Sequence, residues 1–210
     1  SERTLIALDT RTGAESWRFR GRSAFHAPAV FAFDRVYIGN DAGEFYCLSR
    51  EDGEVRFRWP TGASIRFAAR VEGRFVFVTS FGNDLYAYQS RGGAEQLRVG
   101  LPGRPASRPV RFGRRLVVVT YDGALVEVDS GKGEVTRIHQ SPGDLASPPA
   151  FLPARPAPGT EWYAAHRIAL ALRTGEVLLL GHRPAPEEES TKKEEKMETE
   201  SVREDTVSWK

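Results

Sequence analysis

The side chains most able to carry chemistry in this chain are four histidines and one cysteine: His26, His139, His166, His182 and Cys47. No two histidines stand four residues apart, as a metal pair on a helix does, and no carboxylate cluster accompanies them. One cysteine can form neither an internal disulfide nor a cysteine-based zinc cage, and the apolar run around Cys47 predicts a buried, inert thiol. We therefore expect structural or surface histidines, and assign no catalytic, cofactor-binding or metal-binding residue.

Motifs that mark a nucleotide-binding or catalytic site are incomplete or missing. Gly131-Lys132-Gly133 resembles part of a phosphate-binding loop, but it lacks the remaining glycine spacing and the Ser or Thr after the lysine. A Gly-x-Ser-x-Gly nucleophile elbow does not occur in the sequence. Lys132 is therefore predicted to be a turn residue, and the function has to be sought in the architecture.

An apolar cluster recurs along the chain every 40 residues. The clusters begin at Leu5, Phe45, Leu85 and Leu125. Each is followed by a turn glycine and, soon after, by an acid. The glycines are Gly13, Gly53, Gly93 and Gly133, with Gly175 coming 42 residues later, and the acids are Glu15, Glu54, Glu95, Glu134 and Glu176. A constant period of this length indicates a repeat architecture.

Each period contains four candidate strands. Short β-branched or aromatic runs at 36–39, 75–78 and 116–119 precede the apolar clusters, and tight turns such as Asp122-Gly123 join the two. Shorter segments lie further upstream, near 27–30, 68–71 and 107–110. The body shows no helical periodicity. Four antiparallel strands in about 40 residues predict an all-β fold of β-propeller blades, since a sandwich would not repeat at constant length.

The first copy of the repeat carries a recognisable motif. Residues Ala7-Leu-Asp9-Thr-Arg-Thr12-Gly13-Ala-Glu15-Ser-Trp17 resemble the repeat of the PQQ-type (quinoprotein-like) β-propeller family. The later copies keep parts of this motif: Gly53, Glu54, Phe57 and Trp59, then Ala87, Gly93 and Glu95, then Asp129, Gly133 and Glu134. The resemblance implies that the tryptophan lies between neighbouring blades. We expect the glycines to supply positive φ, and Asp9 and Asp129 to accept bonds from turn N–H groups.

The repeat divides the chain into a partial blade at 1–20 and blades at about 26–60, 66–100, 107–140 and 147–183. In the last blade, a proline-rich insertion at 153–158 replaces a short turn, and the register stays open. Its residues 168–176 match both the opening strand with its Thr-Gly turn and the strand at Leu116 with its Asp-Gly turn. Relatives usually carry seven or eight blades. The four to five blades here are therefore either part of such a ring or a small closed ring, and the opening half-blade favours the former.

Residues 184–210 differ in composition from the body. Through Arg183 the chain carries 24 Arg and 1 Lys against 19 acids, whereas the tail has 4 Lys and 1 Arg against 9 acids. This shift predicts a disordered, acidic Glu/Lys-rich tail. A short linear motif anchored by Val202, Val207 and Trp209 is the alternative, and Glu–Lys pairs would support a weak helix over 187–200.

The resemblance is to the non-catalytic, BamB-like branch of the family. It implies a protein-binding scaffold in outer-membrane protein assembly, located in the periplasm or cell envelope, without a cofactor. Membrane association would occur only through partners or an anchor outside these residues, since no apolar run approaches the about 20 residues that cross a bilayer. The alternatives are a quinone (PQQ)-dependent dehydrogenase fragment, whose paired cysteines Cys47 alone cannot supply, and a cell-surface ectodomain. No nucleic-acid partner is expected, because the arginines alternate along strands.

Overall fold

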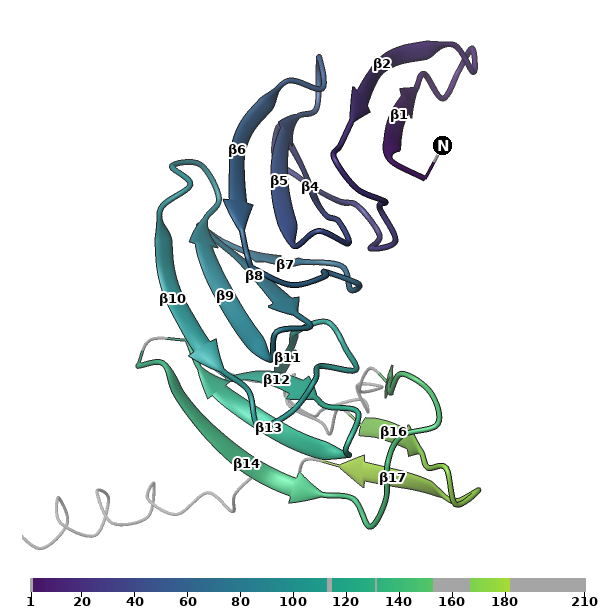
Figure 1. The fold of residues 1–210 in the computed structure, drawn as a ribbon, viewed down its shortest axis with the longest axis vertical. Helices are drawn as coiled ribbons and strands as arrows, with labels where there is room; N and C mark the ends of the chain where they lie inside the picture. Colours follow the sequence, from purple (N-terminus) through teal and green to yellow (C-terminus); the bar gives the residue numbers. More distant parts are fainter. Residues whose placement is uncertain (1, 113–114, 131, 153–166, 182–210) are drawn as a thin grey trace, which may run out of the picture.

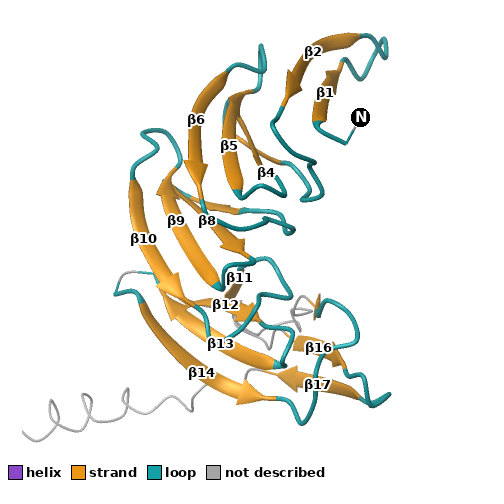
Figure 2. Cartoon of the chain, viewed as in Figure 1, coloured by secondary structure: helices purple, strands orange, loops and turns teal. Residues whose placement is uncertain are grey.

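The computed structural model describes residues 2–112, 115–130, 132–152 and 167–181. This part of the chain consists of β-strands and turns, without a helix (Figure 2). The same residues therefore contain no helix suited to spanning a membrane. The strands form five antiparallel sheets that follow one another along an arc (Figure 1). The predicted all-β fold of propeller blades is confirmed.

We number the sheets as blades in chain order. The first blade has two strands, β1 (Thr4–Leu8) and β2 (Glu15–Arg20). The second comprises β3 (Val30–Ala32), β4 (Arg35–Gly39), β5 (Glu44–Ser49) and β6 (Val55–Pro60). The third comprises β7 (Arg70–Glu72), β8 (Phe75–Ser80), β9 (Asp84–Gln89) and β10 (Glu95–Gly100). The fourth comprises β11 (Val110–Phe112), β12 (Arg115–Val119), β13 (Ala124–Asp129) and β14 (Glu134–Gln140). The fifth comprises β15 (Ala150–Leu152), β16 (Arg167–Ala171) and β17 (Val177–Gly181).

The strand order within every blade follows the sequence, so each blade is a simple meander. The fourth strands β6, β10 and β14 lie on the convex side of the arc, and the first strands lie toward its concave side (Figure 1). Neighbouring first strands are linked on that side: Arg111 Nη1 of β11 lies 2.7 Å from Glu72 Oε2 of β7.

Antiparallel pairing gives each blade two distinct ends. The turns between first and second strands and between third and fourth strands lie at one end, which we call the hairpin rim. The turns between second and third strands lie at the other end, together with the links to the next blade, and we call this the linker rim.

The hydrophobic core lies between adjacent blades. Successive strand residues point to opposite faces of a sheet, so neighbouring residues enter different clusters. Val36 packs with the first blade, whereas Tyr37 packs with the third. Likewise Leu125 packs with the fifth blade and Val126 with the third. Both faces of the second, third and fourth blades are buried, which explains why their second and third strands are apolar at consecutive positions.

Trp17 occupies the interface between the first and second blades. Its Nε1 donates a hydrogen bond of 2.8 Å to the Arg50 carbonyl oxygen. Its ring covers Gly53, where a Cβ atom would lie 2.6 Å from Trp17 Cε3. Gly53 also has a φ of +75°, so this position excludes a side chain on two grounds. The same contact recurs in the next two interfaces with smaller side chains: Phe57 meets Gly93, and Leu97 meets Gly133.

The structure assigns the register of the fifth blade, which the sequence left open. Residues 167–171 form β16, the second strand of the blade, and pair with β15 and β17. Gly175 therefore lies in a second-to-third-strand turn on the linker rim, the place of Gly43 and Gly123 in other blades. This corrects the expectation that Gly175 and Glu176 continue the Gly13 series. The proline-rich insertion and the tail at 184–210 lie outside the described residues.

The glycine contact under Trp17 gives a stability prediction with a matched control. Gly13 has a φ of +72° and no atom within 4 Å of the place that a Cβ would take, whereas Gly53 has Trp17 above it. We expect Gly13→Ala to lower the free energy of unfolding by about 1 kcal/mol through backbone strain alone. Gly53→Ala should cost about 2–4 kcal/mol, because overpacking adds to that strain. Urea unfolding measures both, and equal losses would contradict the wedge contact.

Candidate functional site

The sequence motif residues do not converge on one site. The residues Asp9, Gly13, Glu15, Gly53, Glu54, Gly93, Glu95, Asp129, Gly133 and Glu134 lie in or beside third-to-fourth-strand turns, one set in each of the first four blades along the hairpin rim. Trp17 and Trp59 lie on the fourth strands β2 and β6 and face the next blade. Trp59 stacks on Tyr88 with ring centroids 4.5 Å apart and donates from Nε1 to the Gly93 carbonyl oxygen. These contacts are structural.

The motif aspartate organises its own turn. Asp9 Oδ1 accepts hydrogen bonds from the backbone N–H groups of Thr12 (2.8 Å) and Arg11 (2.9 Å) and from the Thr12 hydroxyl (3.0 Å). These bonds, those from Thr12 first, hold the pKa of Asp9 below its ordinary value. In the fourth blade, Asp129 Oδ1 accepts from the Lys132 N–H at 3.2 Å. Lys132 is thus a turn residue, as expected.

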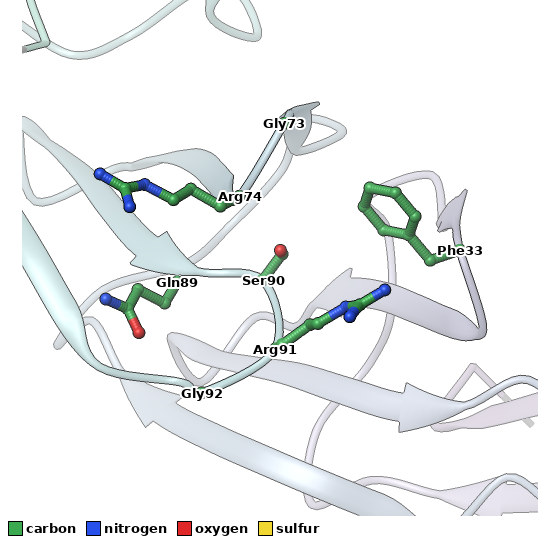
Figure 3. Close-up of a pocket in the computed structure, with 7 residues that line it drawn as sticks. All are labelled: Phe33, Gly73, Arg74, Gln89, Ser90, Arg91 and Gly92. Carbon is green, nitrogen blue, oxygen red and sulfur yellow. The ribbon is translucent and has the colours of Figure 1, made fainter.

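A pocket of about 420 Å³ opens on the hairpin rim between the second and third blades (Figure 3). Three turns build it: the β3–β4 turn of the second blade, and the β7–β8 and β9–β10 turns of the third. Its lining comprises Phe33, Gly73, Arg74, Gln89, Ser90, Arg91 and Gly92.

Backbone hydrogen bonds hold these turns in place. In the third blade, the Ser90 N–H donates to the Arg74 carbonyl oxygen (2.8 Å), which joins the first and last hairpins of the blade. In the second blade, the Arg50 N–H makes the equivalent bond to the Asp34 carbonyl oxygen (2.9 Å). The buried Tyr37 hydroxyl donates to the Ser90 carbonyl oxygen at 2.7 Å and thereby ties the two blades together beneath the pocket. The pocket floor is therefore fixed.

Phe33 stands out because its backbone is in the left-handed region. It is the first residue of the two-residue β3–β4 turn, with a φ of +57°, and its side chain is 56% exposed. The equivalent residue of the third blade is Gly73, with a φ of +53°. A bulky residue in this conformation is strained, and such strain is typical of functional positions. The sequence analysis missed Phe33. The signal was available, because Phe33, Gly73 and Gly113 are 40 residues apart, so the second copy of the repeat has phenylalanine where the next two copies have glycine.

Two arginines give the pocket a positive charge. The Arg91 guanidinium lies 5.8 Å from the centroid of the Phe33 ring, and the two side chains converge from different blades (Figure 3). Arg74 lines the opposite side of the pocket, and its side chain points away from Phe33 (Figure 3), with the guanidinium 5.2 Å from the centroid of the Phe75 ring. The lining has no carboxylate, and neither arginine pairs with an acid among the described residues. This pocket suits a ligand that combines an apolar group with a carboxylate.

A second polar group lies on the linker rim around Asp41. His26 Nδ1 lies 2.9 Å from Asp41 Oδ2, while the Ser64 hydroxyl (3.1 Å) and Arg66 Nε (3.0 Å) approach Asp41 Oδ1. The Ser64 hydroxyl donates to the Asp41 carboxylate and not to the His26 imidazole. Ser64, His26 and Asp41 therefore do not form a nucleophilic relay. The His26–Asp41 contact was missed in the sequence because the two residues lie in different loops.

The remaining chemistry-bearing residues are dispersed. Cys47 is a free, fully buried thiol on β5, and His139 lies on the outer strand β14. His166 and His182 lie outside the described residues. The described ranges hold no group of three or more His, Cys, Asp or Glu side chains that could bind a metal ion.

A comparison with protein-family models identifies the family of this chain. The family model described as outer membrane protein assembly factor BamB matches residues 1–68 and 59–180. No curated protein matches the chain. The crystal structure of BamB from Moraxella catarrhalis shares 22% identity at a TM-score of 0.66, covering 86% of this chain and 52% of that one.

Two computationally designed proteins are also similar in fold. Ika8 has a TM-score of 0.65 at 16% identity, covering 86% of this chain and 53% of that chain. Ika4 has a TM-score of 0.61 at 15% identity, covering 82% of this chain and 100% of that chain. The chain thus spans about half the length of BamB and Ika8 and the whole of Ika4.

The strain at Phe33 predicts an unusual stability change. Phe33→Gly removes left-handed strain worth about 1–2 kcal/mol, while the freer unfolded chain costs about 0.4–1 kcal/mol. The free energy of unfolding should therefore stay constant or rise by up to about 1.5 kcal/mol. Gly73→Ala, at the equivalent position with a φ of +53°, is the control and should lower it. A clear loss of stability in Phe33→Gly would show that the side chain is needed for folding.

The buried thiol gives a labelling prediction. Burial raises the pKa of Cys47 to about 11, so native protein at pH 8 holds little thiolate. A thiol-specific reagent should modify the native protein at least about 100-fold more slowly than the protein unfolded in guanidinium. Because Cys47 is the sole cysteine, the measured rate belongs to it alone. Rapid, complete labelling of the native protein would contradict the burial.

Proposed function

We propose a function from one premise: the chain belongs to the family described as outer membrane protein assembly factor BamB. On that basis it is a non-catalytic β-propeller scaffold that binds other proteins in outer-membrane protein assembly. We place it outside the cytoplasm, in the periplasm or cell envelope, because the family is described by a role at the outer membrane.

The pocket between the second and third blades supports this proposal. It lies on the hairpin rim, where turns from two rigid blades meet and leave side chains free for contacts. The observation that carries the proposal is the exposed aromatic side chain of Phe33, which lies in a strained turn beside Arg91. Aromatic residues and arginine are the side chains most enriched in the energetically dominant parts of protein interfaces.

The chemistry of the pocket indicates the kind of segment that it would bind. Phe33 offers an apolar face, and Arg74 and Arg91 offer unpaired guanidinium groups within the described structure. An extended partner segment with an apolar side chain next to an aspartate or glutamate would satisfy both. Such a segment needs no cofactor and no reacting group on this chain.

The non-catalytic part of the proposal rests on how the polar groups are used. Asp9 and Asp129 bond turn backbone, and Asp41 is shared by His26, Ser64 and Arg66. Catalysis requires a nucleophile, a base and a group that orients the base within reach of one substrate atom. The side chains named above instead bond the backbone of their own turns or side chains of neighbouring loops.

The test is a binding experiment with the purified chain immobilised against a cell-envelope extract of the source organism. Retained proteins are identified by mass spectrometry, and we expect outer-membrane β-barrel proteins or their assembly factors. Phe33→Gly and Arg91→Ala should each reduce retention at least about tenfold, as expected for central interface residues. The same proteins, purified, then give dissociation constants.

Two further variants make the result specific. Arg56→Ala removes an arginine of β6 that pairs with Asp52 and Glu54 and does not line the pocket, and it should leave binding unchanged. A chain ending at residue 183 tests whether the acidic tail contributes. Retention that survives both pocket variants but is lost with the tail would move the site to the tail. Failure of the folded chain to retain any envelope protein would overturn the scaffold proposal.

A further inference from the structure

The third-to-fourth-strand turns of the first four blades share one backbone hydrogen bond. In each turn the N–H of the repeat glycine donates to the carbonyl oxygen of the residue four positions earlier, over 2.8–3.1 Å. The φ of this glycine is 72–75° in all four turns. The segments 9–14, 49–54, 89–94 and 129–134 can therefore be compared position by position.

Three of these turns contain a carboxylate that bonds the backbone of its own turn. In the first turn, Asp9 Oδ1 accepts hydrogen bonds from two successive backbone N–H groups, those of Arg11 and Thr12. In the fourth turn, Asp129 accepts from the N–H at the position of Thr12. In the second turn, Asp52 bonds a backbone N–H two residues further along. Successive N–H groups of a turn form a concave site that suits an anion.

The third turn differs because its segment 89–94 contains no acid. Gln89 stands where the first and fourth turns have aspartate. The N–H groups of Arg91 and Gly92 occupy the two positions that bond the carboxylate in the first turn. Neither donates to an acceptor in the part of the chain that the structure describes. The third turn therefore keeps the donors of the motif and lacks its anion.

The unbonded donors lie on the pocket between the second and third blades, since Gln89, Arg91 and Gly92 all line it. Figure 3 shows the Gln89 side chain within the curve of the turn and the Arg91 side chain directed toward Phe33. Gln89 Oε1 lies 2.9 Å from the place that a Cβ of Gly92 would take, but it accepts no hydrogen bond from the described residues. An incoming anion would thus displace only an uncharged, flexible amide.

We propose that the β9–β10 turn binds a carboxylate of a partner protein, at the place that the motif aspartate takes in the first and fourth blades. The Arg91 and Gly92 N–H groups donate to this carboxylate, and an adjacent apolar group of the partner lies on Phe33. Gln89 determines the specificity of the site, because an acid at this position would fill the site from within. Only the source of the carboxylate, a partner protein, rests on the proposed function.

The test follows the backbone amide signals of the full chain by NMR during a titration with sodium acetate. Sodium chloride and sodium phosphate at equal ionic strength are the reference anions. We expect the Arg91 and Gly92 amide protons to move downfield and to saturate, with a dissociation constant on the order of 10 mM. The Arg11 and Thr12 signals are the internal control and should not respond, because Asp9 already accepts their bonds.

Two variants of Gln89 separate the filled site from an empty one. Gln89→Asp supplies the carboxylate from the chain itself, so the Arg91 and Gly92 signals should lie downfield without acetate. The response to acetate should then weaken at least about tenfold, because a second carboxylate is repelled and finds no free donor. Gln89→Ala removes the amide without adding charge and should keep the acetate affinity within about threefold. A merely structural effect at this position would appear in both variants.

Blocked peptides distinguish a side-chain carboxylate from the carboxyl end of a chain. One peptide has phenylalanine beside aspartate, and its match has asparagine in place of the aspartate. A third ends in phenylalanine with a free carboxylate and contains no acidic side chain. We expect the aspartate peptide or the free-ended peptide to bind more tightly than acetate, because the phenylalanine adds a contact with Phe33. The asparagine peptide should bind at least about tenfold more weakly than the tighter of the two.

Three results would overturn the proposal. An Arg91 or Gly92 response to chloride or phosphate as large as that to acetate would show a general attraction of anions. An acetate response that persists in Gln89→Asp would place the carboxylate elsewhere, and no response at all would show that these N–H groups bind only water. The titrations use no cell-envelope protein, so their failure leaves the scaffold proposal standing. Conversely, acetate binding by a chain that retains no envelope protein would overturn the scaffold proposal alone.

Discussion

The structure depends on one constraint: the second, third and fourth blades bury both faces of their sheets, and each does so between two other blades. The second and third strands are apolar at successive positions, which a sheet with one wet face would not tolerate. Val36 and Tyr37, adjacent in sequence, therefore enter clusters on opposite sides of one blade. The core is a series of apolar layers, each lying between two adjacent blades. Each blade is therefore stabilised mainly by its contacts with the neighbouring blades, as in other repeat proteins.

The close approach of blades explains the glycines of the repeat. A turn of one blade must lie beneath a fourth-strand side chain of the blade before it, as Gly53 does beneath Trp17. The side chain at that position changes from tryptophan to phenylalanine to leucine along the chain, while the glycine is kept in each copy. The close contact between the turn backbone and the fourth-strand side chain is thus the stricter requirement. A Cβ atom on the glycine would clash with that side chain, whereas the side chain itself can vary in size.

The rims are free of this constraint, and there the chain departs from its own repeat. Phe33 stands where Gly73 stands in the next blade, and Arg91 reaches it from the neighbouring hairpin. The backbone bonds from Ser90 and the Tyr37 hydroxyl hold the turns rigidly, so the side chains above them are presented in a fixed arrangement. Such an arrangement suits recognition of a partner, since little conformational freedom is lost on binding.

The sequence alone determined the blade repeat, the all-β class and the turn glycines, because these follow from local patterns of strand, turn and period. It also indicated the tryptophan contact through the family motif. The tertiary structure decided the register of the fifth blade, since residues 168–176 fit two strand positions locally and only pairing with β15 and β17 separates them. It likewise brought Phe33 to Arg91 and His26 to Asp41, pairs from separate loops that a sequence pattern cannot join.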